Sequence, residues 1–322
     1  MAAQTVQKFS TRNNKRERSR LVFYVAMFAI PLIQFIVFYI YANFNSLIMS
    51  FQKYVANEDG LGYSAVFVGF DNFKTAFKVF FSPEVGDMIK FSFIFYACNL
   101  FIVTPLALIF SFYIAKNYRF SGFFRIMLYL PCVLSAIVLT ILYKYVVTDV
   151  YRKLVELFGG GMVTGLLDGT KETQFKAILF YNLWLAYGTN TMLYTGAMTD
   201  INPSLVEAAK LDGAGPVRQF IHLYVPMIWP TLVTFIVTGL AGVFVEQMQL
   251  YSFFGGGGAN LFSTFGYYFY TQSVGSNLYV AEGSKYLSYP QLSALGVLVT
   301  CILIPIVLLV RKLLLKYGPS TK

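Results

Sequence analysis

Residues 91–115 read FSFIFYACNLFIVTPLALIFSFYIA, without a single Asp, Glu, Lys or Arg. A transmembrane helix needs about 20 predominantly apolar residues to cross the hydrocarbon core of a bilayer. An uncharged run of this length is typical of such a helix rather than of the interior of a soluble domain. The stretch therefore predicts that the chain crosses a membrane.

Five further stretches of similar length also lack charged residues. They are residues 21–41, 126–143, 177–198, 227–245 and 292–310. Charged residues make up only 12% of the 322 residues, about half the share of a soluble domain, and apolar residues make up 57%. The sequence predicts an all-α membrane protein with six transmembrane helices.

The positive charge is concentrated in four of the segments between these spans. Residues 1–20, 116–125, 199–226 and 311–322 hold 15 of the 25 Lys and Arg residues and four of the 15 acids. Because basic loops remain in the cytoplasm, both termini are expected there. This divides the chain into a basic cytoplasmic segment (1–20), a transmembrane domain (21–310) and a basic cytoplasmic tail (311–322).

The high isoelectric point, about 9.3, could also indicate nucleic-acid binding. The basic cluster Lys15, Arg16, Arg18 and Arg20 directly precedes the first span, however. Such a cluster is typical of a segment that orients the protein and touches anionic lipid headgroups. We therefore expect contact with membrane lipid and no nucleic acid.

Two glycine runs, at residues 159–161 and 255–258, could in principle cradle a phosphate. A P-loop ends in Gly-Lys-Ser or Gly-Lys-Thr, and the chain has no Gly-Lys dipeptide. The three cysteines lie in apolar runs, and the one histidine, His222, has no accompanying nucleophile or carboxylate pattern. The sequence predicts neither a nucleotide or other cofactor, nor a metal site, nor catalytic residues.

The predicted inner loop at residues 199–226 contains signals for two short helices. Asn202 is a good N-cap, Pro203 fits the first helical position, and Gly213 or Gly215 could end a helix of about nine residues. So short a helix needs a surface to pack on, and Ala208 and Ala209 would give it a low-profile face.

A second helix is predicted from Pro216 to about residue 224, ended by Pro226. It would rest its apolar face on the membrane domain through Val217, Phe220, Ile221 and Tyr224, which recur at helical spacing. A rigid two-helix elbow below the membrane could be a mechanical coupler or an ordinary loop between helices. The residues alone favour neither.

The same loop resembles the EAA loop of ABC-importer permeases. The resemblance lies in Glu207-Ala208-Ala209, then Asp212-Gly213-Ala214, then Phe220, Pro226 and Pro230. Residues 67–73, 123–125, 130–131 and 255–260 resemble the carbohydrate branch, especially its maltose permease-like subunit, so the likeness extends from about residue 21 to the end. The sequence departs at Gly258, where relatives often have Pro, and around residues 245–249, which concerns the substrate rather than the family.

The resemblance implies a type I ABC-importer permease fold in a bacterial cytoplasmic membrane. It implies four kinds of partner: a second homologous permease subunit, two ATPase subunits, an extracytoplasmic solute-binding protein and a carbohydrate substrate. The ATPases would hydrolyse ATP, so this chain is expected to be a transport subunit and not an enzyme. The coupling residues that it implies are Glu207, Ala208, Ala209, Asp212 and Gly213.

Two polar stripes are candidates for the path of a sugar. One, within residues 177–198, consists of Tyr187, Asn190, Thr191 and Tyr194; the other consists of Thr231, Thr234, Thr238, Gly242, Glu246 and Gln249, with Tyr251 at its outer end. Aromatic rings cover the apolar face of a sugar, and amides and hydroxyls bond its hydroxyl groups. Ordinary helix packing through small and hydroxyl residues is the alternative.

Other functions stay open on the residues alone. The chain could be a permease for a solute that is not a sugar, or an ion-coupled secondary transporter, which would need ionisable residues inside its spans. A membrane-embedded enzyme should show clustered acids, histidines or metal ligands at one membrane face, and a passive anchor would use the elbow to hold something other than an ATPase.

Overall fold

The computed structural model describes residues 2–57, 62–161, 163–256, 261–278, 280, 284 and 286–319, with side chains from Arg18 onward. The described chain is almost entirely helical, with one exception. Strands β1 (Gln52–Ala56) and β2 (Tyr63–Phe67) form an antiparallel hairpin in which Gln52 is opposite Phe67. The expectation of an all-α protein is therefore corrected: aromatic and β-branched residues outside the predicted spans form a small sheet.

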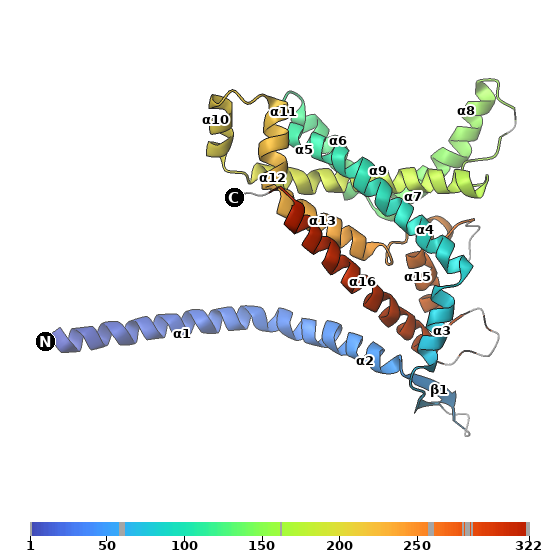
Figure 1. Ribbon diagram of the computed structural model, residues 1–322, viewed down its shortest axis with the longest axis horizontal. Coiled ribbons are helices and arrows are strands. Elements are labelled where there is room, and N and C mark those ends of the chain that lie inside the picture. The colour runs from blue at the N-terminus through green and yellow to red at the C-terminus, as the bar shows by residue number, and fades with distance from the viewer. Residues whose placement is uncertain are drawn as a thin grey trace.

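The N-terminal helices extend away from the rest of the molecule (Figure 1). Helix α1 (Ala2–Phe35) continues through the π-helical turn η1 (Ile36–Tyr41) into α2 (Ala42–Met49). In the apolar part of this rod, which contains the predicted span 21–41, no residue is buried within the chain. Between Arg18 and Met49 the rod thus presents its apolar side chains outward.

Two other predicted spans are unbroken helices. The stretch 91–115 lies in α4 (Pro83–Cys98), the π-helical turn η2 (Asn99–Val103) and α5 (Thr104–Ala115), which run on from one another. The stretch 292–310 lies in α16 (Tyr289–Tyr317). With Arg18–Met49 these are the three unbroken helices of the described chain that are long and apolar enough to cross a membrane.

Two of the predicted spans coincide with bends in the structure: 126–143 is broken within its length, and 227–245 begins at a break. Helix α6 (Ser121–Val133) meets α7 (Ala136–Tyr145) and its continuation η3 (Val146–Val150) and α8 (Tyr151–Leu157) at 98°. Pro131 leaves a backbone carbonyl without its helical donor, and Leu134 is extended (ψ 151°), so the helix stops there. The second bend, 65°, precedes α13 (Trp229–Gly242).

Helix α9 (Lys171–Thr199) contains the predicted span 177–198 and packs along α5 and α6. It is long enough to span but carries many polar residues. The Ser111 hydroxyl on α5 donates to the Thr191 carbonyl on α9 (2.9 Å), and both residues are fully buried. This bond fixes the two helices against each other.

Three short helices complete the far end of the bundle. They are α3 (Asp71–Phe80), α14 (Leu250–Phe254) and α15 (Phe265–Gly275). Helix α3 packs on α16, and Asn72 donates to the carbonyls of Ser50 and Gln52, which ties α3 to the end of the N-terminal rod. Of the second glycine run, residues 257 and 258 lie outside the described residues, as do 259 and 260.

Candidate functional site

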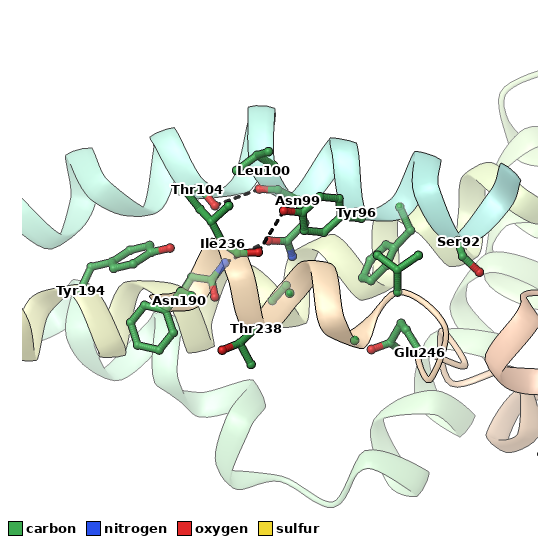
Figure 2. A pocket seen from close by; sticks show the side chains of 16 residues that line it. Ser92, Tyr96, Asn99, Leu100, Thr104, Asn190, Tyr194, Ile236, Thr238 and Glu246 are labelled. Carbon is green, nitrogen blue, oxygen red and sulfur yellow. Dashed lines mark hydrogen bonds between the residues drawn. The ribbon is translucent and has the colours of Figure 1, made fainter. Parts of the chain in front are cut away.

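A cavity of about 350 Å³ lies between α4–η2–α5, α9 and α13 (Figure 2). Its polar lining comes from three separate segments of the chain. The lining side chains that carry an oxygen or nitrogen are Ser92, Tyr96, Asn99, Thr104, Asn190, Tyr194, Thr238 and Glu246. Polar groups are costly inside a bilayer unless they face protein or water, so their convergence marks a candidate functional site.

The π-helical turn η2 places Asn99 opposite α9. Asn190 donates through Nδ2 to Asn99 Oδ1 (3.3 Å), and the Thr104 hydroxyl donates to the Asn99 carbonyl (3.1 Å). Pro105 follows directly, and its missing N–H makes a regular helical bond impossible at this point. A wider turn absorbs that irregularity, and such turns occur often at functional sites.

Contacts across the cavity hold α4 to α13. The Tyr96 hydroxyl donates to the Ile236 carbonyl (3.0 Å), and Figure 2 shows this ring crossing from α4 towards α13. Thr238 and Gly242 line the cavity from α13. The helix that contains Tyr96 and Asn99 is therefore hydrogen-bonded to α13 on one side of the cavity and to α9 on the other.

The chain leaves α13 after Gly242 in an unusual turn. Met248 (φ 50°) and Gln249 (φ 56°) are consecutive non-glycine residues in the left-handed region, which is unfavourable for both. Glu246 Oε1 accepts the backbone N–H of Met248 (2.8 Å), so the carboxylate stabilises the turn that carries it. The prediction that residues 246 and 249 continue a helical stripe is wrong, because α13 ends earlier.

Neighbouring helices support this turn from two sides. Asn182 on α9 donates to the Met248 carbonyl (3.0 Å), and the Thr264 hydroxyl donates to the Glu246 carbonyl (2.9 Å). A Cβ at Gly266, on α15, would lie 2.6 Å from the Glu246 carbonyl oxygen, closer than real Cβ atoms come. Only glycine allows α15 to approach this closely.

A second cavity, of about 520 Å³, adjoins the turn and shares Gly242 and Glu246 with the first. Its other lining residues are Val245, Gln247, Gln249, Tyr251, Ser252 and Tyr270. Glu246 therefore lies where the two cavities meet.

The structure brings together most of the predicted path residues. Asn190, Tyr194, Thr238 and Glu246 line the first cavity, and Gln249 and Tyr251 line the second. Tyr187, Thr191, Thr231 and Thr234 line neither. Tyr187 packs its ring against Phe110, and Thr191 is buried and donates to the Tyr187 carbonyl (2.8 Å). Both take part in helix packing.

Sequence reasoning missed the residues that the α4–η2–α5 rod contributes. Ser92, Tyr96, Asn99 and Thr104 all lie within the apolar stretch 91–115. A signal was available, because Ser92, Tyr96 and Asn99 recur at helical spacing and an Asn inside an apolar span is rare.

The predicted two-helix elbow is present. Helix α10 (Pro203–Leu211) is followed by α11 (Pro216–Gln219), the π-helical turn η4 (Phe220–Tyr224) and α12 (Val225–Met227). Asn202 caps α10 by accepting the Ser204 N–H (3.0 Å), and Gly213 has φ 73° where the chain leaves α10, as predicted for a stop.

Helix α10 lies at the edge of the molecule, and none of its residues is buried (Figure 1). Glu207 and Ala208 are exposed, Ala209 is half-buried, and Asp212 and Gly213 are exposed. Leu211 is 89% exposed.

The second part of the elbow packs differently from the prediction. Phe220 and Tyr224 contact the membrane domain as expected, but Val217 and Ile221 are 71% and 52% exposed, and Gln219 is buried instead. The π-helical turn is the reason, because it brings residues five apart, rather than four, onto one face.

Lys116, at the end of α5, holds the elbow. Its Nζ donates to Gln219 Oε1 (2.5 Å) and lies over the rings of Phe112 and Tyr224 (5.7 and 5.2 Å to the centroids). Gln219 in turn donates to the Ala214 carbonyl (2.6 Å). The elbow is thus joined to α5, which is itself hydrogen-bonded to α9 through Ser111.

Burial lowers the pKa of the Lys116 ammonium, and the charge of Lys210 on α10 lowers it further. The cation–π contacts favour the charged form at the same place. Lys116 therefore interacts with both halves of the elbow, with Lys210 on α10 through charge and with Gln219 and Tyr224 by direct contact.

The sequence is similar to a known protein family and to individual relatives. The family model of the binding-protein-dependent transport system inner membrane component matches residues 104–316. The probable ABC transporter permease protein YurN of Bacillus subtilis (strain 168) is 26% identical over 249 residues, covering 75% of this chain and 83% of YurN. The polygalacturonan/rhamnogalacturonan transport system permease protein YteP of the same strain is 24% identical over 317 residues, covering 94% and 93%.

A solved structure shares the fold. A chain from the crystal structure of a bacterial ABC transporter involved in the import of the acidic polysaccharide alginate superimposes with a TM-score of 0.69 at 20% identity, covering 94% of this chain and 98% of that one. The family match runs from the start of α5 almost to the end of α16 and so takes in the cavity helices α9 and α13 and the elbow. The chain therefore belongs to the binding-protein-dependent transport system inner membrane components, as a multi-pass transport subunit and not an enzyme.

Proposed function

We propose that this chain is the membrane-spanning permease subunit of an ATP-driven importer for a sugar or oligosaccharide and forms half of the translocation path. The observation that carries the proposal is the cavity between α4–η2–α5, α9 and α13, on which polar side chains from all three segments converge. A soluble polar solute needs such a lining to cross a bilayer.

The proposed topology has six spans with both termini in the cytoplasm, and retains residues 1–20 and 311–322 as basic segments around the domain 21–310. The distribution of Lys and Arg supports it. The three unbroken helices, the two bent pairs and α9 together supply six passes. The basic cluster before the first span would contact anionic lipid headgroups.

The elbow at residues 199–226 would be the coupling loop. Its helix α10, with Glu207, Ala208, Ala209, Asp212 and Gly213, would dock into one of two cytoplasmic ATPase subunits. Its exposure and low-profile alanines support this role. A second homologous permease subunit would complete the path, and an external solute-binding protein would deliver the substrate, as the family description implies.

Two connections would transmit motion of α10 to the cavity. One runs along the backbone through α12 into α13, which lines the cavity directly. The other runs from Gln219 through Lys116 to α5, and from Ser111 to α9. Closure of the ATPases would thereby rotate both cavity walls and alternate access between the two membrane faces.

The carbohydrate assignment rests on the chemistry of the lining. Amides, hydroxyls and a carboxylate can exchange hydrogen bonds with sugar hydroxyls, and Tyr96 and Tyr194 offer aromatic faces. The similarity to YteP, whose name assigns it saccharides, supports the same class. A permease for a non-sugar solute is the second candidate, because the same amides and hydroxyls would bind other polar solutes. An ion-coupled secondary transporter is less well supported, because Glu246 is the one Asp, Glu, Lys, Arg or His among the described residues that line the two adjoining cavities.

Transport by the reconstituted importer tests the proposal. The complete complex in proteoliposomes, with its binding protein outside and ATP inside, should accumulate a labelled saccharide. Replacing Asn190, Tyr194 or Glu246 by Ala should change the substrate concentration dependence of uptake. Thr234→Ala is the control, because Thr234 is exposed on α13 and lines neither cavity. Unaltered concentration dependence in all three variants would refute the assigned path.

A further inference from the structure

Glu246 is the one charged side chain that lines either of the two adjoining cavities, and it lines both. No Lys, Arg or His lies among the described lining residues of these cavities. Figure 2 shows its side chain just beyond the end of α13, with the carboxylate directed to the side on which Thr238 lies. Any solute that passes from one cavity to the other would meet this negative charge.

The position of the carboxylate is fixed by the fold. The turn at residues 246–249 contains two left-handed non-glycine residues, and such strain persists only where surrounding contacts enforce it. Asn182, Thr264 and the close approach at Gly266 supply those contacts. The bond from the Met248 N–H to Glu246 Oε1 then sets the direction of the side chain.

The carboxylate has acceptor capacity left for a ligand. An ionised carboxylate has about four lone-pair sites, and the Met248 N–H occupies one. Neutral sugars present many hydroxyl donors, which bind well to a carboxylate. A polyuronate instead brings one negative charge per sugar unit, and like charges brought close together repel each other.

We propose that Glu246 makes this path selective for uncharged saccharides and excludes polyuronates. The proposal rests on the function proposed above and narrows its substrate class. It would separate this chain from the alginate importer that shares its fold, since alginate is an acidic polysaccharide, and also from YteP, whose name assigns it the polyuronate polygalacturonan. The selectivity resides in one side chain, so it can be removed without altering the shape of the cavity.

Matched probes and an isosteric variant test it. The complete importer in proteoliposomes is given labelled trisaccharides in pairs that differ only at C6: galactotriose and trigalacturonate, mannotriose and trimannuronate, cellotriose and its triuronate. Uptake is measured with wild type, with Glu246→Gln, whose amide oxygen can still accept the Met248 N–H, and with the control Thr234→Ala. For each pair, the ratio of uronate uptake to neutral uptake is the readout.

The wild type should accumulate at least one neutral trisaccharide and less than a tenth as much of its uronate. In Glu246→Gln that ratio should rise at least tenfold, and in Thr234→Ala it should not change. A wild type that imports a uronate as well as its neutral partner would overturn the proposal while leaving the transport function intact. So would an unchanged ratio in Glu246→Gln, because the binding protein alone would then select the substrate.

Two further results are also decisive. If the wild type accumulates none of the six probes in an ATP-dependent way, the proposed saccharide transport fails, and this proposal fails with it. If Glu246→Gln does not assemble, as judged by size exclusion and by ATPase activity, the proposal is tested with the ratio of uronate uptake to neutral uptake in the wild type and in Glu246→Asp. Glu246→Asp retains the charge and should retain the exclusion of uronates.

Discussion

The two ends of α13 differ in how they are held. Its first residue follows the elbow, where α10 has no buried residue and is joined to the bundle mainly through the second half of the elbow. Its last residue leads into the turn at 246–249, which α9, Thr264 and Gly266 enclose, with Met248 fully buried. Helix α13 thus connects the elbow, which carries the exposed helix α10, to an enclosed turn. We call these its open end and its closed end.

The difference indicates a division of work along α13. Few contacts within the chain constrain α10, so a partner can cover it and move it, whereas the start of α13 is itself packed, with Ile228 and Leu232 buried and Trp229 Nε1 donating to the Leu314 carbonyl (3.0 Å). The closed end is over-determined by its neighbours, so it keeps a strained backbone and a directed carboxylate. Substitutions should therefore affect stability at the closed end and coupling at the open end.

The largest effect is expected at the closed end. Gly266→Ala would place a Cβ 2.4 Å from the Val245 carbonyl oxygen, so α15 must move away from the turn. Overpacking of this kind costs about 1–3 kcal/mol. We expect a large loss of assembled complex and a lower midpoint in thermal unfolding followed by fluorescence-detected size exclusion.

Gly196→Ala is the matched control for this change. Gly196 is on α9, and a Cβ there would meet no atom within 4 Å. This variant should assemble and unfold like the wild type. Equal stability of the two variants would show that the turn is not enclosed as described.

The next effect belongs to the open end. Glu207 is exposed on α10 and makes no contact that stabilises the fold. Glu207→Ala should leave assembly of the permease domain and its thermal unfolding unchanged but reduce ATP-driven uptake about tenfold or more. Paired measurements of uptake and of binding-protein-stimulated ATPase activity check it.

Ser204→Ala, at the start of the same helix, is the control. It loses the hydroxyl that donates to Asn202 Oδ1 (3.0 Å), but its backbone N–H still donates to the same oxygen (3.0 Å). Its uptake should remain within about twofold of wild type. Wild-type transport by Glu207→Ala would remove α10 as the coupling helix.

The elbow could be predicted from the sequence, whereas the turn could not. Asn202, Pro203 and Gly213 act on their own neighbours in the chain, so local patterns were sufficient to place α10. The turn depends on Asn182, Thr264 and Gly266, which approach it from elsewhere in the fold. A stripe continuing to residue 249 was therefore predicted, and the helix in fact ends at Gly242.

Departures from regular helix geometry account for the other misses. Next to the π-helical turn η4, Gln219 is buried and Val217 is exposed, the reverse of the prediction. The 98° bend after α6 interrupts an apolar stretch in which no charged residue marks the interruption. Hydropathy gave the apolar stretches correctly because it reports composition, which bends do not change. Pro131 and Asn99 were the visible signs, and both lie inside predicted spans.

A smaller effect is expected where the elbow is fastened. Lys116→Met retains much of the apolar contact with Phe112 and Tyr224 but loses the bond to Gln219 and the cation–π contacts. Uptake should fall about three- to tenfold, with ATPase activity retained, because the elbow then moves without carrying α5. Lys116→Arg should restore part of the uptake.

Site-directed crosslinking of α10 to the ATPase distinguishes this role from misfolding. Lys116→Met should crosslink like the wild type, since α10 itself is unaltered. Loss of the crosslink together with uptake would assign Lys116 to the structure of the elbow rather than to transmission.

The smallest effect is expected from the conformation that ends α10. Gly213 has φ 73° and open space around it, so Gly213→Ala meets no clash and only the left-handed backbone opposes it. That costs about 1–2 kcal/mol for an ordinary residue and less for Asn. We expect a two- to threefold fall in uptake, with Gly213→Asn close to wild type, because the elbow frays but can still reform when the ATPase covers it. Gly215→Ala should have no effect, since Gly215 has φ −66° and similar open space. An equally large loss of uptake in Gly215→Ala and Gly213→Ala would mean that the ATPase subunit needs a residue without a side chain at both positions. Contact with the ATPase, rather than the left-handed turn after α10, would then be the reason for glycine at residue 213.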